Sequence, residues 1–283
     1  MTDLGASDSR LHVPAEELAS LSGIERRALL FARWLNASPL HPLSHWINTR
    51  IHRRWIQWLA TSRRLHTVGL DRLVDMPTDR GVLIASNHRS FFDQFIIACS
   101  IYQATNRWPR FYFPVRSEFF YDHPVGVFLN AFATSATMFP PVFRPRPKRG
   151  VTRAGLEFLS HELQSPGTLV GIHPEGTRGK GPDPYELLSA EPGFGKVVLQ
   201  AKPVVIPVFI RGLSNDALHE IKCNIAGREP IIIVFGEPVD VSDFNDEDPR
   251  LLRHQMQVGR RVLEEVAQLA EQEKQVRQEL QSG

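Results

Sequence analysis

The pattern of hydrophobic and polar residues changes along the chain, from helical spacing near the N-terminus to short apolar runs beyond residue 65. In residues 14–36 and 43–62 the apolar positions recur at helical spacing, and we expect two helices joined by the loop 37–42. The apolar positions of the second helix fall on one face and consist of Ile47, Ile51, Trp55, Trp58 and Leu59. The opposite face carries Arg50, Arg53 and Gln57, so the helix is predicted to be amphipathic.

Beyond residue 65 the pattern changes to short, continuous apolar runs separated by helical stretches. The predicted strands are 82–85, 110–115, 168–172, 204–210 and 230–235. The predicted helices between them are 91–102, 150–163 and 195–201. Continuous apolar runs are typical of strands that are covered on both faces. The alternation predicts an α/β fold with a mostly parallel central sheet layered by helices.

The C-terminal region predicts one more helix. Asp248 is suited to cap it and Pro249 to its first position, and apolar residues from Leu252 to Val266 repeat at helical spacing. Beyond Ala270 nearly all residues are Glu, Gln, Lys or Arg, so we expect the end to fray. The predicted organisation is a disordered segment 1–13, an amphipathic helical segment 14–64, an α/β domain 65–245, and a helix with a polar tail 246–283.

Charge is unevenly distributed, although the formal net charge is only +2. From Arg26 to Leu70 there are eight arginines and no acidic residue, and four of the five tryptophans lie in the same stretch. Arginine beside tryptophan on amphipathic helices is typical of segments that lie in a lipid interface. Two alternatives are helices packed on the domain with solvated arginines, and a nucleic-acid-binding surface.

Membrane spans, secretion signals and structural disulfides are not predicted. No stretch offers about 20 consecutive apolar residues, and the best candidate, 125–143, is interrupted by polar residues and by Pro140 and Pro141. The first eight residues lack a basic start followed by an apolar run. Cys99 and Cys223 are too few to cross-link a chain of 283 residues.

A histidine and an aspartate follow the first predicted strand of the sheet. His88 lies in the turn after the strand, and Ser90 is suited to cap the next helix, which would put Asp93 at the third helical position. In that arrangement Asp93 can reach His88. An imidazole held by a carboxylate is suited to remove a proton from a hydroxyl. Taken alone, the pair fits a simple helix cap equally well.

A second polar loop, 173–181, follows the predicted strand 168–172. It contains Glu175, Gly176, Thr177 and Arg178, and its glycines and basic residues are suited to bind a phosphate. It lacks the glycine and the Ser or Thr of a Walker loop. Glu175 would pair with Arg178 or reach a substrate hydroxyl. A solvated surface loop is the alternative.

The order of these motifs resembles the glycerolipid acyltransferase family typified by 1-acyl-sn-glycerol-3-phosphate acyltransferases. The resemblance covers residues 65–240 and rests on Asn87-His88 with Asp93, Arg116-Ser-Glu-Phe, Phe143-Arg144, Pro174 to Arg178, and Val205-Ile-Pro-Val. Arg116 stands where the family usually has lysine, and His173 stands where it usually has phenylalanine.

The resemblance implies an O-acyltransferase with His88 and Asp93 as catalytic residues and Arg116, Arg144, Glu175, Gly176, Thr177 and Arg178 as substrate-binding residues. His88 would deprotonate the hydroxyl of a lysophospholipid, foremost 1-acyl-sn-glycerol-3-phosphate, which would attack the thioester of acyl-CoA or acyl-carrier protein to give phosphatidate. The resemblance implies no metal and no other cofactor. The alternatives are an acyltransferase for another lysolipid and a non-catalytic membrane-binding relative. A hydrolase is disfavoured because no Gly-x-Ser-x-Gly motif is present.

The implied substrates of phospholipid biosynthesis reside in bilayers, which favours the membrane interpretation of the basic segment over nucleic acid. We therefore expect the partner of residues 14–64 to be an anionic membrane surface. The expected location is peripheral or monotopic, on the cytoplasmic face of a membrane.

Overall fold

The computed structural model describes residues 11–37, 41–76, 79–134 and 136–282. Most of the predicted disordered segment 1–13, and residues 38–40 of the predicted loop, therefore lie outside the described residues. Leu11 and Val13 are described and both are buried in the hydrophobic core. The prediction of disorder is wrong for these two residues.

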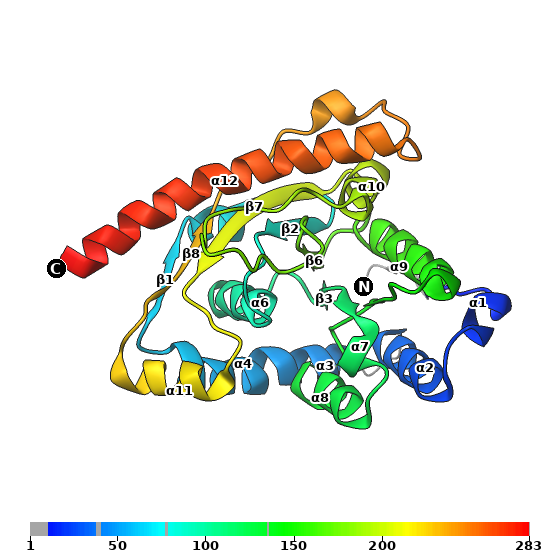
Figure 1. Ribbon diagram of the computed structural model, residues 1–283, viewed down its shortest axis with the longest axis horizontal. Coiled ribbons are helices and arrows are strands. Elements are labelled where there is room, and N and C mark those ends of the chain that lie inside the picture. The colour runs from blue at the N-terminus through cyan, green and yellow to red at the C-terminus, as the bar shows by residue number, and fades with distance from the viewer. Residues whose placement is uncertain (1–10, 38–40, 77–78, 135, 283) are drawn as a thin grey trace, which may run out of the picture.

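A six-stranded sheet forms the centre of the protein, in the order β1-β8-β7-β2-β6-β3 (Figure 1). Its strands are β1 (Leu65–Val68), β2 (Val82–Ser86), β3 (Arg110–Tyr112), β6 (Thr168–Ile172), β7 (Val204–Arg211) and β8 (Ile231–Phe235). All neighbours are parallel except β7 and β8. The predicted α/β fold with a mostly parallel sheet is confirmed. The predicted strand 110–115 ends at Tyr112, and Val115–Arg116 (β4) pairs instead with Pro141–Val142 (β5) in a separate two-stranded sheet.

Alternate residues of the strands enter two hydrophobic cores, one on each face of the sheet. Leu83 and Ala85 of β2 face the first core, together with helices α9 (Arg149–Glu162), α10 (Pro192–Ala201) and α12 (Leu252–Ser282). Val82 and Ile84 face the second core, together with α6 (Asp93–Ala104). Helices thus cover both faces of the sheet (Figure 1), which explains why its central strands β2, β7 and β8 are almost entirely apolar. The remaining helices are α5 (Leu70–Asp75), α7 (Ser117–Phe120), α8 (Pro124–Thr134) and α11 (Ala217–Ala226), with 3-10 turns at Arg146–Lys148 and Ser242–Phe244.

The N-terminal region differs from the two regular helices that the sequence predicts. The first is divided into α1 (Ala15–Ala19) and α2 (Gly23–Ala37). The second runs through α3 (His41–Ile47) and α4 (Arg53–Ile56) and is widened into π-helical turns at Asn48–His52 and Gln57–Thr61. A π turn rotates the following side chains relative to a regular helix.

The apolar face of this second helix points outward rather than into the protein. Trp55 and Trp58 are 57% and 66% exposed, and Ile51 is also exposed. Arg53, predicted to lie with Gln57 on the face opposite the apolar one, donates to Gln57 Oε1 at 3.1 Å and to the Thr49 carbonyl oxygen at 2.8 Å. Among the described residues no helix combines the length and the hydrophobicity that crossing a bilayer requires.

Helix α12 contradicts the prediction of a fraying tail. It begins at Leu252 rather than at Pro249 and continues to Ser282. Asp248 accepts from the Arg250 amide at 2.9 Å in the turn before the helix, so it stabilises that turn and not the helix start. Glu273 is fully buried, and it accepts from the Tyr185 hydroxyl at 2.7 Å and from Arg277 Nε at 2.8 Å. These bonds hold the polar end of the helix against the domain.

Candidate active site

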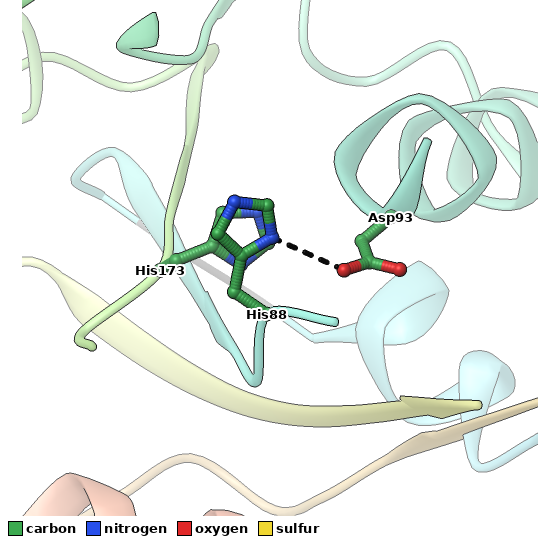
Figure 2. Close-up of side chains that lie close together, drawn as sticks. All are labelled: His88, Asp93 and His173. Atoms are coloured by element: carbon green, nitrogen blue, oxygen red, sulfur yellow. Dashed lines mark hydrogen bonds and ion pairs between the residues drawn. The ribbon is translucent and has the colours of Figure 1, made fainter. Parts of the chain in front are cut away.

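The register of two parallel strands brings two histidines together. Ala85 of β2 is paired with Ile172 of β6. His173 follows β6 directly, and His88 comes two residues after β2, so both lie at the carboxyl end of the sheet. Their rings are stacked, with centroids 3.7 Å apart and planes inclined by 7° (Figure 2). This edge of an α/β sheet is where ligands usually bind.

Asp93 reaches His88 from the start of α6. His88 Nδ1 lies 3.2 Å from Asp93 Oδ2 (Figure 2), and the same oxygen accepts from the backbone amides of Arg89 and Ser90, each at 2.8 Å. The predicted contact between His88 and Asp93 is present, but the position of Asp93 in its helix differs from the prediction. Asp93 is the first residue of α6 and not the third, because Ser90 Oγ accepts from the Phe92 amide in the preceding turn.

Glu175 lies behind His88 and outside the cavity. It is 1% exposed, and its carboxylate accepts from the His88 amide at 2.8 Å and from the Leu188 amide at 2.7 Å. The prediction that Glu175 pairs with Arg178 is wrong, since Arg178 donates to Asn215 Oδ1 at 2.7 Å. Its burial also keeps Glu175 from reaching a substrate hydroxyl. Its contacts fix the backbone of His88.

His88 opens into a cavity of about 1130 Å³ with a basic lining. The predicted binding residues Arg116, Arg144, Gly176 and Arg178 line it. Three further cationic residues also line it, namely Arg149, Arg153 and Lys196. Thr177 lies beside the cavity, where its hydroxyl accepts a hydrogen bond from Arg116. The structure thus gathers basic groups from β4, α9, α10 and the loop after β6 around one histidine.

Lys148, in contrast, is directed away from the cavity. Its ammonium group contacts both carboxylate oxygens of Glu25 at 2.7 Å, which ties the segment before α9 to α2. It is therefore used to hold the N-terminal region in place.

The surroundings shift the pKa values of the central groups in opposite directions. Burial, followed by the charges of Arg178 and Arg116, lowers the pKa of His88 to about 3. Burial raises the pKa of Asp93 to about 6. At neutral pH His88 is therefore uncharged and able to accept a proton, while Asp93 is ionised.

Two groups of side chains bring metal-ligating atoms together among the described residues. The first is His88, Asp93 and His173. Two parallel stacked rings direct their in-plane lone pairs along separate planes, so this group does not converge on one ion. The second is His219, Cys223 and Glu229, where His219 Nε2 lies 3.1 Å from Glu229 Oε2 and 3.3 Å from Cys223 Sγ. These contacts are accounted for as hydrogen bonds within the group.

Sequence reasoning missed the polar residues beneath the two rings. Ser86 and Gln94 are buried and hydrogen-bonded to each other at 3.1 Å, and Ser86 also contacts His173. A buried glutamine in the first turn of an otherwise apolar helix was the available signal. Asn87 belongs to the motif that carries the resemblance, and the structure gives it a role: its side-chain amide exchanges two hydrogen bonds with the backbone of Ile210 and so joins the loop to β7.

Comparison with known proteins identifies one family and several solved structures of similar fold. Residues 65–211, just over half of the chain, match the protein family described as Acyltransferase. Among solved structures, the chain is similar to the 1-acyl-sn-glycerophosphate acyltransferase PlsC from Thermotoga maritima, at 18% identity and a TM-score of 0.44, over 78% of this chain and 79% of that one. No curated protein sequence matches the chain.

Proposed function

The chain belongs to the acyltransferase family, and from that premise we propose that it transfers a fatty acyl group from a thioester donor to the hydroxyl of a lysophospholipid. The observation that carries the proposal is the His88–Asp93 pair at the wall of a basic cavity. Family membership makes it an O-acyltransferase. The acceptor, the donor and the residue roles are our proposals.

The reaction begins when Nε2 of neutral His88 removes the proton of the acceptor hydroxyl. Asp93 holds Nδ1, which leaves Nε2 as the basic nitrogen, and it stabilises the imidazolium that forms. The hydroxyl oxygen then attacks the thioester carbonyl carbon. The carbon–sulfur bond breaks, and the leaving thiolate takes the proton from His88. No protein nucleophile is needed, because the substrate supplies the hydroxyl.

We assign the acceptor's phosphate to Arg116, Arg144 and Arg178. All three line the same cavity. Burial, then the charge of Arg144 and, against the opposing charge of Glu118, that of Arg178 lower the pKa of Arg116. A phosphate offers several oxygens to such a group of guanidinium forks. It would also offset the two charges that depress the pKa of His88 and so make His88 a stronger base. 1-Acyl-sn-glycerol-3-phosphate is the preferred acceptor on these grounds, with acyl-CoA or acyl-carrier protein as donor and no metal or other cofactor.

The test is thiol release from a thioester donor, measured over a panel of lysolipids that differ in head group. We expect lysophosphatidate to be acylated fastest. His88→Ala should lower kcat by about 1000-fold, and the exposed His161→Ala should leave it unchanged. If another lysolipid is preferred, the head-group assignment is wrong. If neither acyl-CoA nor acyl-carrier-protein donors release thiol with any acceptor, the chain is a non-catalytic relative.

We further propose that an exposed apolar face places the protein on an anionic membrane surface, on its cytoplasmic side. The face combines the N-terminal helices with α8, which lies beside them (Figure 1). Its most exposed apolar side chains are Trp34, Leu43, Trp46, Trp55, Trp58, Val125, Phe128 and Phe132. Exposed aromatic residues in such number are typical of membrane-contacting surfaces.

Vesicle co-sedimentation tests this surface. Replacing Trp55 and Trp58 by Ser, and separately Phe128 and Phe132 by Ser, should each weaken binding to anionic vesicles by about 10-fold or more. The control is Leu251 and Leu252 replaced by Ser, because these residues are exposed near the start of α12, away from the face. Arg50→Gln with Arg54→Gln should weaken binding to anionic vesicles and make the remaining binding less sensitive to salt, because fewer charges face the surface. Unchanged sedimentation of the aromatic variants would end the proposal.

A further inference from the structure

A second line of contacts reaches His88 and passes through side chains that the proposed chemistry does not use. Gln94 Nε2 donates to Ser86 Oγ at 3.1 Å. The hydroxyl and the backbone carbonyl oxygen of Ser86 each lie 3.1 Å from His173 Nδ1. The ring of His173 in turn stacks on His88 (Figure 2). Asp93 and Gln94 are neighbours at the start of α6, so one turn of this helix reaches His88 from two sides.

The members of this line have little freedom to move. Ser86 is fully buried and Gln94 is 4% exposed. Gly171 of β6 leaves room for Gln94, because a Cβ atom there would lie 2.1 Å from Gln94 Oε1. Side chains enclosed in this way hold the groups they contact in one orientation.

The hydrogen bond to Ser86 also fixes the protonation of His173. A carbonyl oxygen only accepts, so His173 Nδ1 carries the hydrogen. Burial, followed by the nearby His88, lowers the pKa of His173 to about 3, so its ring is neutral at pH 7. The face of a neutral aromatic ring attracts a positive charge placed over it. His173 therefore does not oppose the charge that His88 gains when it accepts a proton.

We propose that His173 is a positioning residue for His88: anchored on Ser86, its ring sets the plane of the His88 ring, so that Nδ1 stays on Asp93 and Nε2 stays directed at the acceptor hydroxyl. The inference rests on the proposed function of His88 as the base. The single 3.2 Å contact with Asp93 still permits His88 to tilt about that contact, and the stacked ring removes this motion. Loss of alignment at a reacting atom lowers the rate without weakening substrate binding in proportion.

Three substitutions separate the ring from its anchor. His173→Phe keeps a flat ring without the hydrogen bond, His173→Asn keeps a hydrogen-bonding group without the ring, and His173→Ala keeps neither. We expect kcat to fall about 10-fold or more in the Asn and Ala variants and to stay within about 3-fold of the parent in the Phe variant. The KM for the acceptor should change little in all three. The exposed His161→Ala serves as the control.

A merely structural role would give a different pattern, namely kcat losses that follow the loss of thermal stability, with no rescue by Phe. Gln94→Ala offers a test from a distance: it should lower kcat by about 3-fold in the parent and have no further effect when combined with His173→Ala. Retained kcat in the Asn and Ala variants, or a Phe variant as slow as Ala, would overturn the proposal.

Histidine NMR provides a readout that does not depend on activity. In the parent, the ring protons of His88 should be shifted upfield by the stacked ring, and Nε2 should be its unprotonated nitrogen. In His173→Ala these protons should move downfield and a second tautomer should appear. If His88 gives the same spectrum in both proteins, positioning by His173 is excluded even where no acceptor is acylated. If the spectra differ and no acceptor is acylated, only the proposed function fails.

Discussion

At the scale of single residues, the site is built by acids that contact the backbone as much as by groups that face the cavity. Glu175 binds two amides, one on His88 and one on Leu188, and so connects the loop after β2 to a distant loop segment. Asp93 binds the amides of Arg89 and Ser90 with the same oxygen that holds His88. Both carboxylates thus determine where the backbone of His88 lies.

Glu175→Gln gives the first prediction. The amide that replaces the carboxylate has one accepting oxygen, so one of the two backbone N–H groups would face an NH2 group and lose its bond. We expect the free energy of unfolding to fall by about 1–3 kcal/mol and kcat to fall more than KM changes. Chemical denaturation and steady-state kinetics measure these effects. Glu264→Gln, on the exposed side of α12, is the control. Equal stability of the two variants would contradict the role of Glu175 in holding the backbone of His88.

The contact between His88 and Asp93 was predictable from the sequence because it is local. Five residues and one turn separate the two side chains, and the chemistry of helix starts limits how they can meet. The stacking of His88 on His173 was not predictable in this way. It depends on the register of β2 against β6 and joins residues 85 positions apart, for which a single sequence carries no signal.

At the scale of elements, hydrophobic pattern identified the central strands and misjudged the edges. The predicted strand 168–172 coincides with β6, and 204–210 differs from β7 by one residue, because both are mostly apolar and are covered on both faces. The edge strand β1 escaped prediction, since only two of its four residues are apolar. The two π turns were also missed, and they change which side chains of the second N-terminal helix face outward.

The end of α12 supplies the second prediction. Glu273 is buried and contacts the partly exposed Arg277 and Tyr185, whereas its neighbour Lys274 forms an exposed ion pair with Glu271. Glu273→Ala leaves a largely buried guanidinium without its partner, and we expect it to lower the free energy of unfolding by about 3 kcal/mol. Lys274→Ala should lower it by less than about 1 kcal/mol. Denaturant titration of both variants decides the matter. Similar values would mean that the polar end of α12 contributes little to the fold.

At the scale of the whole molecule, the two stacked, partly buried histidines make stability depend on pH. His88 and His173 have pKa values of about 3 in the folded protein and about 6.5 when unfolded. Below pH 6.5 the unfolded chain therefore binds more protons at these residues, and folding stability falls as the pH decreases. Asp93 acts in the opposite sense, since its pKa is raised to about 6, so the folded protein takes up its proton first. Two histidines outweigh one aspartate, and the net effect is acid lability.

The third prediction uses His173→Phe to isolate the contribution of the His173 ring to the pH dependence of stability. A histidine whose pKa falls from about 6.5 to about 3 on folding costs about 2 kcal/mol of stability at pH 5 and almost nothing at pH 7.5. The Phe variant lacks this cost. Its free energy of unfolding should therefore decrease between pH 7.5 and pH 5 by about 2 kcal/mol less than that of the parent, whatever its stability at pH 7.5. Denaturation curves at the two pH values measure the difference directly.

The control is His161→Phe, at an exposed position, whose free energy of unfolding should fall with pH as that of the parent does. If the His173 variant also declines like the parent, then His173 binds a proton in the folded protein near pH 6. It would then carry a positive charge beneath His88 and could not serve as the neutral support of the base.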